Sequence, residues 1–93
     1  MIGMRFRLKR EILGNSAGTI GYVFNQYPDF DVDGEFGFQI IFRNGDYDGF
    51  SFNERELYLE EDGFEEKYVD YEFQNVMQVS QDFADGYWNF EKQ

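Results

Sequence analysis

The chain has 93 residues, enough for one small domain spanning residues 1–93, and its 22% aromatic content can fill a dense core without any disulfide, since cysteine is absent. Without histidine or cysteine the chain lacks the commonest general base, the thiolate nucleophile and the usual zinc ligands. We therefore expect a protein that is not an enzyme and needs no cofactor. A net charge of −11 disfavours direct binding to nucleic acid or to an anionic membrane and makes a basic partner the natural complement. With no long apolar run and no signal peptide, we expect a cytoplasmic location.

The first half of the chain alternates apolar and polar residues, as strands with one buried face do. This pattern predicts strands over residues 4–9, 19–24 and 36–43, with a loop over 13–18 and a polar loop over 26–34. Four basic residues and no acidic ones lie in residues 1–10. We therefore interpret the basic side of the first strand, with Arg5, Arg7 and Lys9, as an internal complement to the acidic strands.

The pair Asn44-Gly45 is the sharpest local signal in the sequence. It favours the two positive φ angles of a type I′ turn and so predicts a two-residue hairpin loop. In that register Arg43 faces Asp46 and Phe42 faces Tyr47, and a strand over residues 47–52 returns along its partner.

A short helix is predicted next, with Asn53 as its N-cap, Glu56 completing a capping box and Gly63 at its end. Residues 60–62 are all acidic, which conflicts with this helix because its C-terminal end disfavours negative charge. Either the helix frays there or those carboxylates have another role.

Alternation over residues 68–73 predicts a further strand. Residues 75–90 are open to two interpretations, because Asn75 and Gln78 can cap a helix whereas residues 76–79 can also extend the strand. We favour a strand, then a single helical turn, then a terminal extension with Tyr87 and Trp88.

These elements predict an α+β fold that is mostly β, either a small SH3-like barrel or a strongly curved antiparallel sheet with one short helix. Glycines inside the strands, at positions 21, 37 and 49, are where such a sheet can bend.

The order of the elements resembles an SH3-like barrel, with a basic first strand, a long loop, a hairpin and a late helical turn. The stretches over residues 45–51 and 75–83 also resemble small uncharacterised proteins of Gram-positive bacteria and their phages. This resemblance covers about half the chain, includes no catalytic motif and implies a small adaptor or binding module.

Two acidic segments with nearby aromatic residues are the candidate contact surface for a basic partner protein. The candidate residues are Asp29, Asp31, Asp33, Glu35, Glu60, Glu61, Asp62, Glu65 and Glu66, with Tyr27, Phe30, Tyr47 and Phe64 as apolar anchors. The alternative is that this acidity only keeps an aromatic-rich domain soluble.

Two other functions fit the same acidic residues. An inhibitor that mimics nucleic acid needs two parallel rows of carboxylates, because alternate residues of one strand lie about 6.5–7 Å apart and one DNA strand has a charge every ~3.4 Å. A weak divalent-cation site is the other, since residues 29–34 read D-x-D-x-D-G, the opening of an EF-hand loop. Ile40 occupies the position of the bidentate glutamate, which leaves Asp29, Asp31 and Asp33 as ligands or else as a solvated turn.

Overall fold

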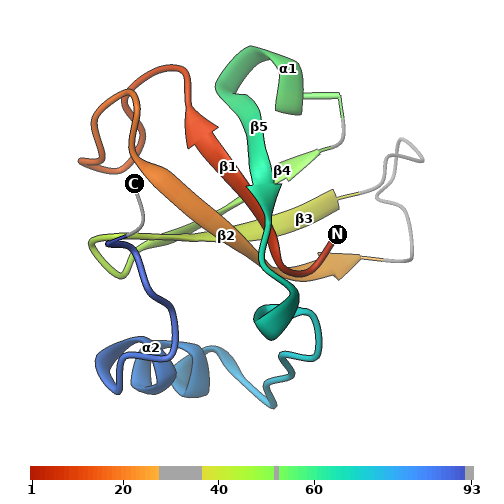
Figure 1. Cartoon of the computed structure of the whole chain (residues 1–93), viewed down its shortest axis with the longest axis vertical. Helices are drawn as coiled ribbons and strands as arrows, with labels where there is room; N and C mark the ends of the chain where they lie inside the picture. The colour runs from red at the N-terminus through yellow and green to blue at the C-terminus, as the bar shows by residue number, and fades with distance from the viewer. Residues whose placement is uncertain (28–36, 52, 92–93) are drawn as a thin grey trace.

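The computed structural model describes residues 1–27, 37–51 and 53–91, and its core is one antiparallel five-stranded sheet (Figure 1). The elements in chain order are β1 (Met4–Leu8), β2 (Ile20–Tyr27), β3 (Gly37–Phe42), β4 (Tyr47–Ser51), α1 (Arg55–Tyr58), β5 (Leu59–Phe64), η1 (Glu66–Tyr68) and α2 (Val76–Ala84). The strands lie in the order β4-β3-β2-β1-β5, and within the described residues β4 and β5 do not pair, so the sheet is not closed into a barrel. The predicted mostly-β α+β class is confirmed.

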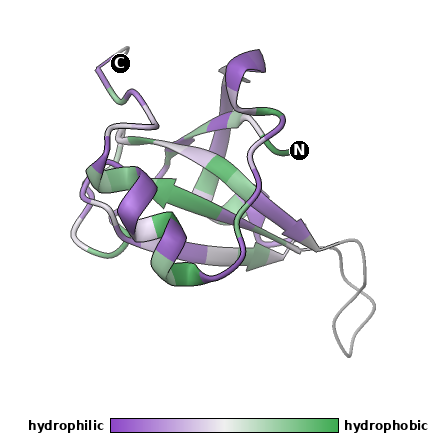
Figure 2. Ribbon diagram, turned by 90° about the horizontal axis from the view of Figure 1, so that it is seen from below, coloured by the Kyte–Doolittle hydropathy of each residue, from purple (hydrophilic) through white to green (hydrophobic). Residues whose placement is uncertain are grey.

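The sheet buries both of its faces, and strand alternation assigns each core residue to one of them. We call one side the phenylalanine face; its buried residues are Phe6, Leu8, Val23, Phe38, Ile40, Phe42, Phe50 and Leu59. We call the other the tyrosine face; its buried strand residues are Ile20, Tyr22, Phe24 and Ile41, covered by Tyr68, Tyr71, Val79, Trp88 and Phe90. Figure 2 shows α2 lying across the sheet.

Gly21 allows the phenylalanine face to pack closely across the middle of the sheet. A Cβ at this position would lie 2.5 Å from Cγ2 of Ile40 and 2.9 Å from Cδ1 of Phe42. On the same face the Phe6 ring on β1 stacks on the Phe38 ring on β3, 5.7 Å between centroids, although β2 separates their strands. That the sheet bends at this glycine stays a prediction; the close contacts are a separate reason for a glycine here.

The hairpin at Asn44-Gly45 is present, but the predicted two-residue loop is wrong by one residue. Tyr47 pairs with Ile41, not with Phe42, and Gly45 donates its N–H to the carbonyl of Phe42 at 2.9 Å. Gly45 has φ +89°, whereas Asn44 does not have a positive φ. These angles are those of a three-residue hairpin loop, here residues 43–45, whose last residue is left-handed. Because side chains alternate, this shift moves Tyr47 to the tyrosine face.

The predicted helix after Asn53 is reduced to the single turn α1, and the acidic residues 60–62 belong to β5. Reciprocal bonds of the capping-box type close the turn before α1, two residues earlier than expected: Ser51 Oγ accepts from the N–H of Glu54 at 3.1 Å, and Glu54 Oε1 accepts from the N–H of Ser51 at 2.9 Å. Glu54, the N-cap of α1, makes no side-chain capping bond to the helix itself. The conflict between these acids and a helix C-terminus is resolved because they are not in a helix.

The predicted strand over residues 68–73 is also wrong. The turn η1 precedes an extended stretch that pairs with no strand in the described part of the chain, although Tyr71 is buried as the alternation requires. Residues 76–79, for which we favoured a strand, begin α2 instead. Asn75 caps this helix by accepting from the N–H of Gln78 at 3.0 Å.

Tyrosine hydroxyls attach the C-terminal segment to the tyrosine face. Tyr22 donates to the carbonyl of Asn89 at 2.6 Å, and the N–H of Asn89 donates to the Tyr68 hydroxyl at 2.7 Å. Tyr71 donates to Asp82 of α2 at 2.8 Å. These bonds place the predicted terminal extension, with Trp88 buried, against β2.

Candidate interaction surface

The second predicted acidic segment forms one continuous strip along an outer strand of the sheet. The strip, which we call the β5 edge, consists of Glu60, Glu61, Asp62, Phe64, Glu65 and Glu66. Within the described residues β5 pairs only with β1, so its other side has no strand beside it. The structure therefore brings six of the thirteen residues of the predicted surface together.

The basic side of β1 neutralises part of this strip, as we predicted. Arg5 contacts Asp62 and Glu65, both at 3.3 Å, and Arg7 Nη2 lies 2.9 Å from Asp62 Oδ2. Arg5 also donates to the carbonyl of Asp62 at 2.8 Å, where the β1–β5 register shifts. Gly63 has φ +123° at this shift, and a Cβ there would lie 2.9 Å from Nη2 of Arg5. Asp62 and Glu65 therefore hold the strand in place.

Three carboxylates of the β5 edge lie outside the ion pairs that its arginines make. Glu60, Glu61 and Glu66 are exposed, and within the described residues they make no ion pair. Glu60 lies opposite Arg7 and Glu61 lies opposite Phe6 in the strand register, so their side chains project to the two faces of the sheet. A ligand at this edge would meet negative charge on both sides of the strand.

Phe64 is an exposed ring at the end of this strip, with 53% of its surface accessible. The ring lies close to Gly3: a Cβ atom on Gly3 would be 3.3 Å from Cε2 of Phe64 and 3.4 Å from the backbone nitrogen of Val69. Val69 is itself 42% exposed. Phe64 and Val69 are thus two exposed apolar residues that both lie near Gly3.

A shallow hollow of about 280 Å³ opens on the opposite end of the strip. It is lined by Phe6, Lys9, Arg55, Glu56, Leu59, Glu60 and Glu61. Lys9 Nζ donates to the carbonyl of Glu56 at 2.6 Å. The hollow thus presents three carboxylates together with two cationic side chains, and its two apolar residues, Phe6 and Leu59, are almost fully buried.

The other predicted surface residues do not join this strip. Tyr47 lies on β4, at the far edge of the sheet, and packs edge-on against Phe24 with 5.7 Å between ring centroids. Tyr27 is the last residue of β2. The remaining predictions, Asp29, Phe30, Asp31, Asp33 and Glu35, including the cation site, lie outside the described residues. Within the described part no three acidic residues are grouped as a metal site.

Val69 is an exposed apolar residue near Gly3 that the sequence analysis did not single out. We assigned it to a strand with Tyr71, whereas η1 turns the chain so that Tyr68 and Tyr71 are buried and Val69 faces outward. The spacing of three between those two tyrosines is typical of a helical turn and was the available signal.

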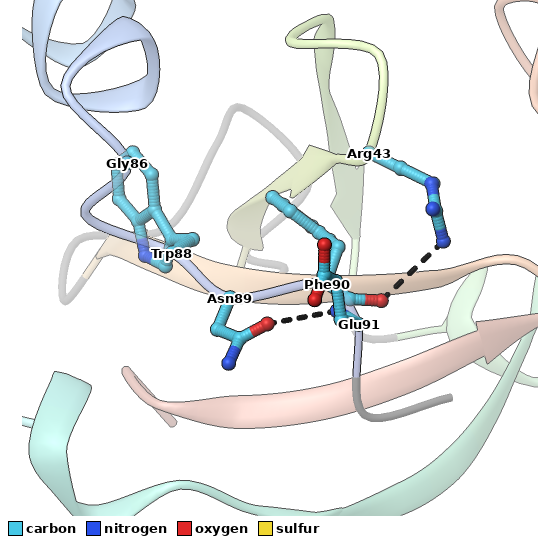
Figure 3. Close-up of a pocket in the computed structure, with 6 residues that line it drawn as sticks. All are labelled: Arg43, Gly86, Trp88, Asn89, Phe90 and Glu91. Atoms are coloured by element: carbon cyan, nitrogen blue, oxygen red, sulfur yellow. Dashed lines mark hydrogen bonds between the residues drawn. The ribbon is translucent and has the colours of Figure 1, made fainter.

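A second hollow, of about 470 Å³, lies near the C-terminal segment (Figure 3). It is lined by Arg43, Gly86, Trp88, Asn89, Phe90 and Glu91. Arg43 donates a long hydrogen bond, 3.5 Å, to the carbonyl of Phe90, and Asn89 Oδ1 accepts from the N–H of Glu91 at 2.8 Å. The indole nitrogen of Trp88 is buried, bonds to no described residue and points away from Arg43 in Figure 3. These groups do not converge on a common point.

The shifted pKa values belong to the tyrosine face and not to the β5 edge. Burial raises the pKa of Tyr71, and its hydrogen bond to Asp82 raises it further. Burial also raises the pKa of Tyr22 and of Tyr87. The raised pKa values favour the neutral hydroxyls, of which Tyr22 and Tyr71 donate the hydrogen bonds described above.

Fold and surface define a small, mostly-β domain with an acidic sheet edge and an exposed ring at its end. No helix among the described residues has the length and apolar character needed to cross a membrane. No protein-family model, curated protein or solved structure matches this chain.

Proposed function

We propose that this protein is a non-catalytic interaction module whose β5 edge binds a basic surface of a partner protein. Glu60, Glu61 and Glu66 supply the charge, and Phe64 with Val69 supplies an apolar contact at the end of the strip. We place its action in the cytoplasm, without direct contact to nucleic acid.

One observation supports this proposal above the others: the Phe64 ring is 53% exposed, whereas every other phenylalanine among the described residues is buried or partly buried. Leaving such a ring in water forgoes roughly 1.5–3 kcal/mol of burial. An exposed ring beside unpaired carboxylates is the arrangement of an interface with a few apolar anchors and a charged rim.

The strand order supports an SH3-like fold as the finer proposal. β5 returns to pair with β1 after the meander β2–β3–β4, and the single turn α1 lies between β4 and β5. The C-terminal segment that covers the tyrosine face is an addition to that plan.

The ion pairs of Arg5 and Arg7 favour a protein partner over nucleic-acid mimicry. A mimic needs closely spaced free carboxylates, whereas Asp62 and Glu65 are held by arginines within the strip. The charge that remains on the β5 edge is sparser than a phosphate backbone.

Affinity capture with matched variants tests the proposal. The bait protein is compared with Phe64→Ala and with the triple variant Glu60→Gln, Glu61→Gln, Glu66→Gln, and we expect a captured basic protein to lose binding about tenfold or more to each. The control is Glu11→Gln, Glu72→Gln, Glu91→Gln, which removes the same charge from exposed positions elsewhere.

Equal loss in the control would show that only total charge matters and would refute the proposal. Release of the partner by a short DNA duplex, with affinity falling steeply as salt rises, would instead establish the mimic. Melting temperatures of all baits confirm that each variant is folded.

A further inference from the structure

The two outer strands of the sheet differ in how their open sides are protected. A strand at a sheet edge presents N–H and C=O groups that can pair with another chain. The carbonyl of Asp46 accepts a hydrogen bond from β3, so the backbone groups of Asp46 point toward β3. Because the direction alternates along an antiparallel strand, the N–H and C=O groups of Gly49 and Ser51 in β4 point away from β3, to the open side. Asp48 accepts the N–H of Gly49 at 2.8 Å, and Glu54 accepts the N–H of Ser51 at 2.9 Å. Carboxylates thus occupy two of the outward N–H groups of this edge, those of Gly49 and Ser51.

The open side of β5 has no such protection at its centre. The N–H of Leu8 donates to the carbonyl of Thr19 at 2.9 Å, and the C=O of Leu8 accepts from the N–H of Gly18 at 2.8 Å, so the backbone groups of Leu8 point toward β2. Phe6 lies two residues before Leu8, so its backbone N–H and C=O also point toward β2. In an antiparallel pair, the partner of such a residue directs its own groups the opposite way. Glu61, the partner of Phe6, therefore presents its N–H and C=O to the open side, where no described side chain bonds to them.

We propose that β5 is the docking edge for an extended basic segment of the partner, which adds to the sheet as a sixth strand beside Glu61. This inference rests on the proposed function and names the form of the partner. Main-chain hydrogen bonds to Glu61 supply the affinity, and side-chain contacts supply the preference for lysine and arginine.

Charge complementarity selects a basic strand as the occupant. The other side of β5 is already paired with such a strand, since β1 alternates Arg5 and Arg7 with apolar residues. Glu60 and Glu61 offer an incoming strand one carboxylate on each face, and opposite charges across neighbouring strands are favourable.

The hollow of about 280 Å³ adds a place for one of its side chains. Glu56, Glu60 and Glu61 line it beside Lys9 and Arg55, while its Phe6 and Leu59 are almost fully buried. A lysine or arginine of the added strand is therefore held there by the carboxylates and not by apolar surface. The register shift at Gly63 bends β5 away and limits the added strand to the segment near Leu59–Glu61.

The test uses a soluble ten-residue peptide of alternating lysine and threonine, blocked at both ends, and the full protein labelled for NMR. We expect the peptide to shift the amide resonances of β5, to slow hydrogen exchange at Glu61 and to leave the β4 amides unchanged. N-methylation of the peptide amides that would face β5 keeps the charge, and we expect it to weaken binding about tenfold because the ladder bonds are lost.

The variant pair Glu60→Gln with Glu61→Gln separates this inference from the proposed function. If the N-methylated peptide binds equally well, or if β4 responds in place of β5, strand addition is overturned. The proposed function of the β5 edge as an acidic binding surface is then supported only if the Glu60→Gln with Glu61→Gln variant still weakens peptide binding more than the Glu11→Gln with Glu72→Gln control. If they do not, both proposals fail together.

Discussion

The phenylalanine face and the tyrosine face belong to the same sheet, yet they are covered in different ways. The phenylalanine face is packed by the strands themselves and by Tyr58 of α1, through a series of ring contacts that includes Phe6, Phe38 and Phe50. The tyrosine face is covered by residues 68–90, which reach it through side chains and hydroxyl bonds and not through strand pairing.

This difference separates two sources of stability. Contacts on the phenylalanine face are lost only if strands separate, so they contribute to global unfolding. The segment over residues 68–90 can detach while the sheet stays paired, as locally unfolding units do. We therefore expect the two faces to differ in opening free energy and in their response to pH.

The largest effects are expected from truncating one buried ring on each face. Phe38→Ala and Trp88→Ala each remove a ring that is almost fully buried, at a cost of about 3–5 kcal/mol. Urea unfolding and amide hydrogen exchange should show that Phe38→Ala lowers protection throughout the sheet, whereas Trp88→Ala first lowers it in α2. Met77→Ala, at a position 78% exposed on α2, is the control and should change stability little.

The comparison breaks if Trp88→Ala lowers protection in β2 and β3 as much as in α2. The C-terminal segment would then be part of one cooperative unit with the sheet, and its hydroxyl bonds would not be separable from the strand pairing.

A smaller effect is expected at Gly21, which sharpens the account of the phenylalanine face. Gly21→Ala places a Cβ 2.5 Å from Ile40, so the face must shift, at a cost of about 1–3 kcal/mol. Gly49→Ala is the matched control, because its nearest neighbours would lie 3.9 Å away. Equal urea midpoints for the two variants would contradict the close packing across β2.

The sequence predicted the phenylalanine face well because that face follows from strand alternation. Phe6, Phe38 and Ile40 alternate with polar or small residues, and period two alone assigns them to one side. The hairpin register failed by one residue since Asn44-Gly45 fits two loop lengths, and only packing of Tyr47 against Phe24 distinguishes them.

The tyrosine face was not predictable in the same way. Tyr68, Tyr71 and Trp88 are positioned by contacts with β2, more than 40 residues earlier in the chain, and no local period encodes these contacts. Tertiary packing also decided residues 76–79, where helix and strand signals coincide.

The candidate site was predicted in composition and not in arrangement. Residues 60–66 were chosen for their charge, but the helix predicted to end at Gly63 hid the fact that Asp62 and Glu65 face Arg5. The complementary charges of β1 were visible in the sequence. Pairing β1 with the acidic segment as strands would have revealed the sheet edge.

The smallest predicted effect at neutral pH, Tyr71→Phe, tests whether the tyrosine face alone responds to alkaline pH. Burial and then Asp82 raise the Tyr71 pKa above its ordinary value of 10.0, so folding favours the neutral hydroxyl. That stabilisation is complete below pH ~10 and is lost as the pH rises through the higher folded pKa, since the unfolded chain ionises first. At pH 7 the variant should cost about 0.5–1.5 kcal/mol for the lost hydrogen bond. Between pH 9 and 11.5 its unfolding free energy should fall less steeply than that of the parent protein, whereas Met77→Ala should keep the parent slope. If the slopes of Tyr71→Phe and the parent coincide, the buried hydroxyl does not control the alkaline response, and the chemical distinction between the two faces fails.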